Sequence, residues 1–502
     1  MELSLKVLSI SDLRDLTGRL SGFSSMHIFT GMHSIRITAI GVLVALLSLT
    51  AHAQNNKDAL TIDQIILEGN KRTKDYVVFR ELEFEPGDVI SSVDAEALWH
   101  ENEKRILSTG LFTHVALEVV PSDVPGSVDV FIVLQENWFL YPNFIFELAD
   151  RNFNVWWNEQ NKSLDRVNIG GRINWINVSG HRDQLKLITQ FGYTRKYDLE
   201  YRFPYLNKAK TLGIGAAVVY TENREIGFET IGNKTEFFSG DDDRVVLQRF
   251  RASSWLTYRP KLYGNHLFKL EYHRNSIDDF VAQELNTEYF LNGESALRFF
   301  HAEYDFSFDR RRYVFYPEGG YQFGINIKKE GLGIFNEYDN FNIELRGEYY
   351  FNIKDRFIIA NLAKVKTNLN RSQVGFANNT GLGYNGNVVS GYELFVVDGT
   401  DFLLTKSSVR WKMIDNLVNL DKLMPLRQFK KMNLKAYLSF NVDTGYVNEP
   451  TYRETNFLNN RFLVGYGPGL DIILFNTHLF SFEYSFNQLG QSALFISNSV
   501  SF

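Results

Sequence analysis

Cysteine is absent from the 502-residue chain, which excludes a disulfide framework and any metal site built on thiolates. Long apolar runs are missing as well. The most apolar stretch, residues 41–50, is too short to cross a bilayer as a helix. An excess of positive charge is also missing, because the formal net charge is −6. That balance argues against a nucleic-acid partner.

Aromatic residues, by contrast, are abundant. The chain contains 42 Phe and 25 Tyr, and aromatics make up 15% of it, although its mean hydropathy is only −0.21. This combination is typical of a membrane β-barrel, whose strands turn half of their side chains to lipid and half to a wet interior. At this length the chain holds either two or three ordinary domains, or one small domain and something larger.

Residues 1–53 are predicted to be an extension followed by a secretory signal peptide. Arg36 precedes the apolar run, and Ala51-His52-Ala53 has the small-x-small pattern of a cleavage site. The stretch before the signal has mixed charge, so we interpret Met26 or Met32 as the true start, with an uncleaved amphipathic anchor as the alternative. Export without a helical anchor places the mature chain in the periplasm, outside the cell or in an outer membrane.

The last eleven residues, 492–502, alternate between apolar and small polar side chains. Leu494, Ile496, Val500 and Phe502 share one face, which Asn498 interrupts, and the other face is mostly Ser and Ala. Such a strand is expected to pair with the first strand of a barrel and remove both sheet edges, because a bilayer offers no water to unpaired backbone groups. The alternative is an edge strand of a soluble sheet.

Residues 60–137 are predicted to form a small domain with the order β-α-α-β-β. A first strand precedes the turn at Gly69-Asn70, and helical patterns follow at 73–82 and 94–107, before and after the turn at Gly87. The second helix is expected to end at Gly110. Two strands, 112–120 and 128–134, complete the domain.

Residues 138–502 are predicted to form a barrel of sixteen antiparallel strands. A clear example of its alternation is Phe480, Phe482, Tyr484 and Phe486, which stand against polar neighbours. The strands are predicted to start near residues 139, 165, 182, 196, 211, 245, 264, 297, 319, 339, 355, 404, 431, 461, 478 and 492. The longest connections, 149–164, 222–244, 276–296 and 369–403, then all fall at the outer end, and 415–430 is the one long connection at the periplasmic end.

The small domain resembles the polypeptide-transport-associated (POTRA) domain that precedes outer-membrane barrels of the BamA/TamA type. The elements that carry the resemblance are Gly69-Asn70, Gly87-Asp88 and Gly110-Leu111-Phe112. The resemblance implies a strand edge that receives client peptides by β-augmentation. The alternative is a generic α+β domain without a client. Only one copy is found, whereas assembly members of the family usually carry several.

Two barrel segments extend the resemblance. Val389-Ser390-Gly391-Tyr392 in the longest outer loop is similar to the Val-Arg-Gly-Phe/Tyr motif, found on a loop that folds back into the lumen. Ser390 stands where the family has an arginine, which puts the loop's anchoring and insertase activity in doubt. Ser390→Arg is therefore predicted to strengthen docking. The alternative is an ordinary short turn.

The second segment, Asp309 to Gly319, resembles the family's Asp-…-Phe-Pro-x-x-Gly element between two strands. Tyr316-Pro317 replaces Phe-Pro, and the glycine comes one residue early unless Gly320 is the equivalent. Arg310 and the two arginines after it are expected at the periplasmic rim, in a solvated basic turn or against anionic head groups rather than in a substrate site.

Nothing in the sequence nominates an enzyme, a cofactor or a metal site. Gly381 to Gly386 spells a dinucleotide fingerprint, but no βαβ unit surrounds it. His100-Glu101 lacks a second histidine at position 104, which is Lys, and no nucleophile turn of the Gly-x-Ser-x-Gly type is present. Interior carboxylates such as Glu344, Glu348 and Glu483 are interpreted as structural or pore-lining.

The resemblance implies a Gram-negative outer-membrane protein that inserts or exports polypeptides, with its POTRA-like domain in the periplasm. Its mechanism would be incomplete pairing between the first strand, 142–148, and the last, 492–502, so that a client hairpin adds at the opened edge. Partners would be outer-membrane lipids, unfolded client polypeptides and periplasmic lipoproteins. The alternatives are a two-partner-secretion transporter for one substrate, and a passive channel or structural barrel.

Overall fold

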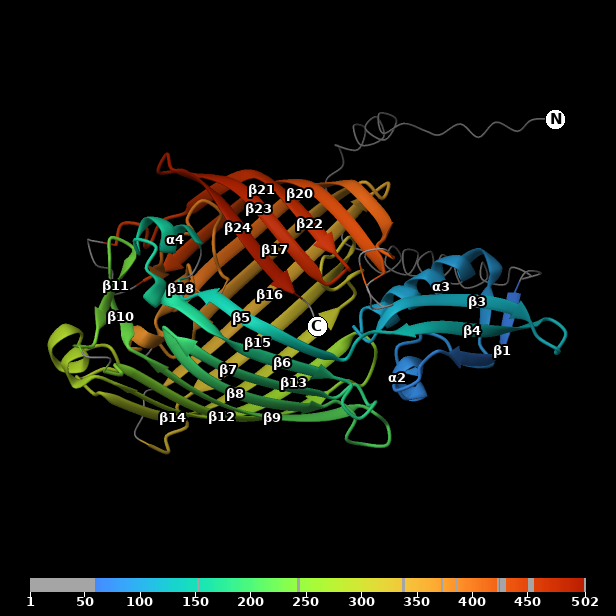
Figure 1. Cartoon of the computed structure of the whole chain (residues 1–502), viewed down its shortest axis with the longest axis horizontal. Helices are drawn as coiled ribbons and strands as arrows, with labels where there is room; N and C mark the ends of the chain where they lie inside the picture. The colour runs from blue at the N-terminus through green and yellow to red at the C-terminus, as the bar shows by residue number, and fades with distance from the viewer. Residues whose placement is uncertain are drawn as a thin grey trace, which may run out of the picture. The chain divides into compact units, whose positions relative to one another are not determined.

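The computed structural model describes residues 59–500 except 151–152, 242–243, 336–338, 372, 385, 422–423, 425–429 and 450–455. The predicted signal peptide and Phe502 lie outside the described residues. Residues 60–502 form one compact unit. It contains a small α+β domain followed by a β-barrel (Figure 1).

The small domain contains four strands and two helices. The strands are β1 (Ala59–Glu68), β2 (Val89–Ser91), β3 (Phe112–Pro121) and β4 (Ser127–Glu136), and the helices are α2 (Asp75–Phe79) and α3 (Ser92–Leu107). The sheet has the order β2-β1-β4-β3, with β1 and β4 parallel. The predicted order is thus confirmed apart from β2, whose three residues are too few for a periodic pattern. The first helix is also shorter than predicted.

Helix α3 packs into the core of the small domain. Asp94 lies in its first turn and Lys104 and Arg105 in its last, where each charge opposes the adjacent end of the helix dipole. Ile106 is fully buried with Leu111, which follows the helix across the turn at Gly110. The short segment after the helix therefore enters the core at once and leads directly into β3.

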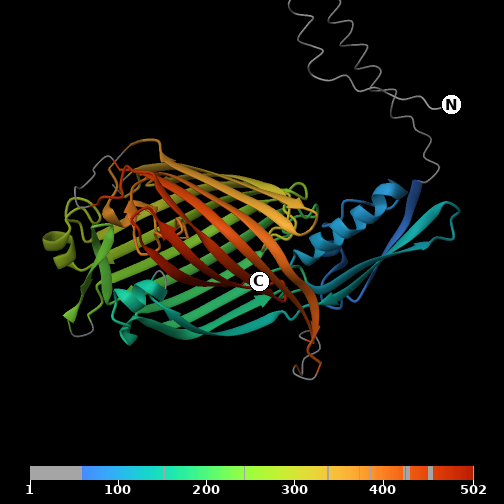
Figure 2. The same ribbon diagram turned by 90° about the horizontal axis from the view of Figure 1, so that it is seen from above.

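The barrel is a 16-stranded antiparallel sheet that curls into a cylinder (Figures 1 and 2). Its strands are β5 (Leu140–Leu148), β6 (Val167–Ile176), β7 (Gln184–Gly192), β8 (Thr194–Phe203), β9 (Leu212–Asn223), β12 (Leu247–Tyr258), β13 (Gly264–Ile277), β14 (Ala296–Asp309), β15 (Gly320–Glu330), β16 (Asn340–Ile353), β17 (Phe357–Asn368), β20 (Asp401–Asn419), β21 (Lys431–Asn448), β22 (Leu463–Leu474), β23 (His478–Asn487) and β24 (Ser492–Val500). The predicted count is confirmed, and the largest error in a start is 404 against Asp401.

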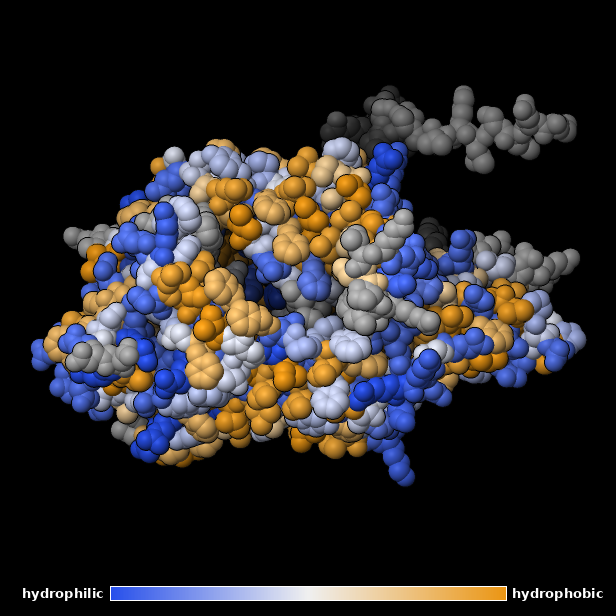
Figure 3. All heavy atoms as spheres, in the orientation of Figure 1, coloured by the Kyte–Doolittle hydropathy of each residue, from blue (hydrophilic) through white to orange (hydrophobic). Residues whose placement is uncertain are grey.

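The outward face of the barrel is apolar and uncovered. On β16, Leu345, Tyr349 and Phe351 are 42%, 53% and 50% exposed, whereas Glu348 is 4% exposed. Apolar side chains gather in patches over the visible wall of the barrel (Figure 3). Exposed rows of this kind match the lipid-facing band of a transmembrane barrel. None of the described helices is long and apolar enough to cross a membrane.

The long connections carry structure of their own. The first contains α4 (Phe153–Asn158) and the turn η2 (Leu164–Arg166), the second a hairpin of β10 (Glu225–Ile231) and β11 (Lys234–Ser239), and the third the turn η4 (Val281–Leu285). The fourth contains the turn η5 (Phe376–Asn378) and the short strands β18 (Thr380–Leu382) and β19 (Val397–Asp398). The predicted connection 415–430 is partly wrong, because the β20–β21 ladder continues to Asn419 and Lys431.

Candidate functional site

The two end strands of the barrel do not form a ladder with each other among the residues that the structure describes. β24 stands at one end of the 16-stranded sheet and β5 at the other, and the surface between them is hollowed (Figure 3). The prediction that the last strand closes the cylinder by pairing is therefore wrong for the described residues. We call the gap between β5 and β24 the seam.

The sequence contains one signal for this seam. Pro142 lies in β5 and has no backbone N–H, so it cannot donate a ladder hydrogen bond and is tolerated where a strand forms a sheet edge. On the same strand Phe144 and Phe146 are 77% and 66% exposed, and on β24 Leu494 and Ile496 are 49% and 50% exposed. Both lips of the seam are thus apolar on their outer face. At the outer end, α4 contacts β24.

A cavity lies at the other end of the seam, beside the small domain. Its volume is about 580 Å³. Tyr141 and Asn143 of β5 line it from one side, Phe475 to His478 of the β22–β23 turn from another, and Gly110 and Phe112 from the small domain. The first residues of β5 and the predicted turn at Gly110 therefore line the same cavity.

The predicted loop motif lies inside the barrel. Val389, Ser390 and Tyr392 are each at most 5% exposed. The Ser390 hydroxyl donates to Asp443 Oδ2 at 2.8 Å, and its amide reaches the same oxygen at 3.2 Å. The loop is therefore docked on β21 without the arginine, whose place is taken by a serine that bonds a carboxylate.

Close backbone approach fixes this docking. Gly391 has φ +81° and its carbonyl accepts a 2.6 Å hydrogen bond from Asn487 of β23. A Cβ at Gly465 would lie 1.5 Å from the Ser390 carbonyl oxygen, and one at Gly445 would lie 2.6 Å from Val389. Glycines on β21 and β22 thus leave the room that the loop occupies.

The connection between β14 and β15 forms a second inward element. Tyr316 donates to Asp471 Oδ2 at 2.7 Å and packs against Tyr437, which lies on β21. Glu318 accepts from Lys412, Lys435 and Tyr437 at 2.7 to 2.9 Å. Burial opposes the charged form of Glu318, but the two lysines outweigh it and lower its pKa to about 2. The turn therefore spans the lumen near the small domain.

Of the three arginines of this turn, Arg310 and Arg312 are exposed as expected, whereas Arg311 is withdrawn from solvent, contrary to expectation. Arg311 pairs with Asp309 at 2.7 Å and with Glu348 at 2.7 Å, and its side chain is 11% exposed. Arg310 lies over the ring of Tyr263 at 4.4 Å, and Arg312 pairs with Glu101 of α3 at 3.5 Å. Short hydrogen-bonded turns of this kind are set by contacts that the local sequence does not reveal.

Gly320, rather than Gly319, is the glycine that the turn requires. Gly320 has φ +90°, and a Cβ there would lie 2.0 Å from the Arg310 carbonyl oxygen. Gly319 is not in the left-handed region, and the nearest atom to its Cβ position is the flexible Arg312 Cδ at 3.5 Å. Pro317 lies between Tyr316 and Glu318 in the same turn.

The predicted turns of the small domain are where the sequence places them. Gly69, Gly87 and Gly110 all have positive φ, at +100°, +95° and +75°. Asn70 Nδ2 donates to Asp75 Oδ1 at 2.7 Å, and Phe112 is 4% exposed in the core. These residues shape the domain, and Gly110 and Phe112 also line the seam cavity.

An ion-pair cluster that sequence reasoning missed joins the small domain to the barrel. Glu81, 3% exposed, accepts from Arg259 at 2.6 and 2.8 Å and from Arg182 at 3.2 Å. Burial raises the pKa of Glu81, but the hydrogen bonds and charges of the arginines outweigh it, so the pKa lies below its ordinary value. The partners are 178 and 101 residues apart, so no sequence pattern links them.

Known proteins match both parts of the chain. Residues 60–137 match the family described as POTRA: Surface antigen variable number repeat. Among solved structures, CdiB from Escherichia coli matches with a TM-score of 0.53 and 13% identity, over 88% of this chain and 76% of that one. BamA from Haemophilus ducreyi lacking POTRA domains 1-3 matches with a TM-score of 0.49 and 14% identity, over 88% and 85%. No curated protein sequence matches the chain.

The likeness to Escherichia coli CdiB is a likeness of fold, at 13% identity. It covers both the small domain and the barrel, since 88% of this chain is aligned. The small domain thus matches a POTRA family model, and together with the 16-stranded barrel that follows it the chain has the fold of Escherichia coli CdiB.

Proposed function

We propose that this protein inserts or exports other polypeptides at the outer membrane of a Gram-negative bacterium, by adding client strands at the seam. The observation that carries the proposal is that the described residues of β5 and β24 form no ladder with each other. A client strand would exchange backbone hydrogen bonds for backbone hydrogen bonds, so the step needs no nucleotide and no covalent chemistry. The protein would act as a binding scaffold, not as an enzyme.

The lumen supports a lateral route rather than a passive pore. The loop around Ser390 is buried inside the barrel, and Leu382, Val389 and Phe395 pack with it into one apolar cluster. Near the POTRA domain, Tyr316 packs with Ile358, Tyr437 and Ile473 from across the barrel. Two inward elements thus occupy the lumen, whereas the hollow at the seam faces outward (Figure 3).

The POTRA domain would supply clients from the periplasm. Strand β3 is the edge of its sheet, and an edge of this kind accepts an extended peptide by β-augmentation. Phe112, the first residue of β3, and Gly110 just before the strand line the cavity that β5 also lines. A client held on β3 would therefore leave next to the seam. Periplasmic lipoproteins and outer-membrane lipids are the further partners that we propose.

The test locks the seam in living cells. Phe144→Cys and Ile496→Cys place one thiol on each lip, in a chain without other cysteines, and a reducible bis-thiol reagent joins them. The matched control joins Leu256→Cys and Phe268→Cys, which face each other across the existing β12–β13 ladder and are both exposed to lipid. Each variant replaces the native protein in a depletion strain, and the outer-membrane and secreted proteomes are quantified.

We expect the seam lock, but not the control lock, to reproduce the depletion, and reduction to reverse it. A broad fall in barrel proteins identifies an insertase, whereas loss of one exported protein identifies a dedicated transporter. A locked seam that leaves both proteomes at their normal levels while depletion lowers them would overturn the lateral mechanism. No proteome change on depletion itself would leave a channel or structural barrel as the function.

A further inference from the structure

The inner wall of the barrel carries a cluster of two histidines and one glutamate. Glu271 and His301 face each other across the β13–β14 ladder, and His273 is the next inward residue on β13. Glu271 Oε2 lies 3.0 Å from His301 Nδ1 and 3.3 Å from His273 Nε2. The Glu271 and His301 side chains are 3% and 5% exposed, and that of His273 is 18% exposed.

These three residues present ligand atoms at the spacing of a metal site. One atom from each lies within 4.8 Å of the other two. In a tetrahedral site with metal–ligand bonds of about 2.0–2.1 Å, ligand atoms are about 3.3 Å apart, close to the separations of Glu271 Oε2 from both imidazoles. A ligand set of two imidazoles and one carboxylate favours Zn²⁺ and the neighbouring transition-metal ions over Mg²⁺ and Ca²⁺.

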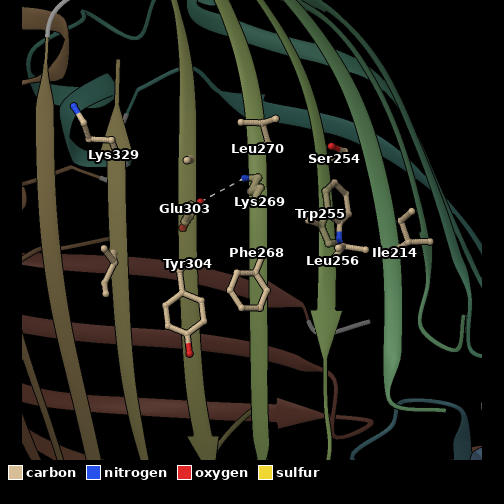
Figure 4. Close-up of a pocket in the computed structure, with 12 residues that line it drawn as sticks. Ile214, Ser254, Trp255, Leu256, Phe268, Lys269, Leu270, Glu303, Tyr304 and Lys329 are labelled. Atoms are coloured by element: carbon tan, nitrogen blue, oxygen red, sulfur yellow. Dashed lines mark ion pairs between the residues drawn. The ribbon is translucent and has the colours of Figure 1, made fainter. Parts of the chain in front are cut away.

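The surroundings of the cluster fit the outer shell of such a site. His301 Nε2 is buried and has no hydrogen-bond partner among the described residues, and Glu303 Oε2 lies 3.6 Å from it. A metal-bound histidine commonly donates its second N–H to a carboxylate. Lys269 pairs with the other Glu271 oxygen, Oε1, at 2.8 Å, so Oε2 is left to the imidazoles. Lys269 and Glu303 are themselves paired across the two strands at 3.9 Å (Figure 4).

An ion could reach the cluster from the POTRA end of the barrel. Glu271 and Glu303 line a cavity of about 520 Å³ that extends to Arg80 and Arg182 beside the POTRA domain. The cavity also leaves room for a water molecule at a fourth coordination position. We propose that Glu271, His273 and His301 bind one divalent transition-metal ion, of the Zn²⁺ class, on the lumen wall, with Glu303 orienting His301.

The test measures metal binding by the whole mature protein in detergent, produced without a histidine tag and stripped with a chelator. Zn²⁺ is titrated calorimetrically, and Co²⁺ is used as a spectroscopic probe of tetrahedral coordination. The variants are His273→Gln and His301→Gln, with Glu303→Gln for the outer shell. The matched control is His266→Gln, a histidine of the same strand on the opposite, lipid-facing side, where it stacks on Tyr304.

We expect one ion per chain, a fall in affinity of at least about 10-fold in each histidine variant and of about 10-fold in Glu303→Gln, and no change in His266→Gln. Circular dichroism checks that each variant is folded, and Glu303→Gln carries the test if a histidine variant is not. Absence of stoichiometric binding in the native chain would overturn the proposal. So would equal binding by the native chain and both histidine variants.

Discussion

Individual glycines decide where the barrel's inward turns can form. Gly320 holds a φ of +90° and an added Cβ would lie 2.0 Å from the Arg310 carbonyl oxygen, whereas at its neighbour Gly319 φ is ordinary and an added Cβ would meet only the Arg312 side chain, at 3.5 Å. We predict that Gly320→Ala destabilises the folded barrel by at least about 1–2 kcal/mol, the cost of left-handed backbone for an L-residue, and that Gly319→Ala changes it little. Thermal unfolding in detergent measures both. Equal effects of the two substitutions would contradict this assignment of the turn.

Some individual residues could be placed from the sequence, and others could not. Gly69, Gly87 and Gly110 could be predicted as turn positions, because their conformational freedom is a property of the residue itself. The pairing of Ser390 with Asp443 could not, because it joins positions 53 apart through a loop that folds into the lumen. His273 and His301 meet only because β13 and β14 are in a particular register, so a search for histidines close in sequence passes over them.

At the scale of elements, the lumen loop is held by a few named contacts. Ser390→Ala removes the hydrogen bond to Asp443, and we predict a loss of about 1 kcal/mol in docking, seen as faster protease cleavage within residues 383–396. Ser390→Arg, which we predict strengthens docking, would place a cation beside the same carboxylate. In an Asp443→Ala background, which removes the acceptor as well as the charge, both substitutions should lose their effect. Unchanged cleavage in Ser390→Ala would show that the glycine contacts alone hold the loop.

Strand positions could be predicted closely, and strand pairing less so. The alternation of Phe and Tyr with polar residues set all sixteen starts, because each strand reads its two environments directly. The β10–β11 hairpin and the continuation of the β20–β21 ladder to Asn419 were missed, since both depend on a partner strand. The prediction that the last strand pairs with the first was wrong for the same reason. The pattern of 492–502 predicts a strand, but it does not tell whether that strand pairs with β5. Pro142 was the local signal that it does not.

At the scale of the whole molecule, a buried ion-pair cluster joins the two domains. Glu81 of the POTRA domain is held by Arg259 and Arg182 from two barrel turns, and Arg80 donates to the Arg259 carbonyl at 2.6 Å. Removing one partner of a buried pair leaves the other charge without compensation and typically costs about 3–5 kcal/mol. The cluster therefore controls how firmly the POTRA domain is held beside the seam.

This cluster predicts a pH dependence with a definite sign. The pKa of Glu81 is lower when the domains are docked than its ordinary value of about 4.3, so its contribution to docking is complete above that value and is lost as pH falls through the docked pKa. Spin labels at Asp123→Cys and Lys208→Cys, on exposed turns of the two domains, report the docking distance. We predict a narrow distribution of distances at pH 7 that broadens below about pH 4.

Glu81→Gln should broaden this distribution already at pH 7, because the amide cannot balance the charge of the buried Arg259. The matched control is Glu85→Gln, which should keep the narrow distribution. Glu85 is an exposed carboxylate six residues after the end of helix α2 in the POTRA domain. A native protein with the same distribution at both pH values, or a Glu81→Gln variant indistinguishable from Glu85→Gln, would show that docking depends on the surrounding apolar contacts and not on this charge.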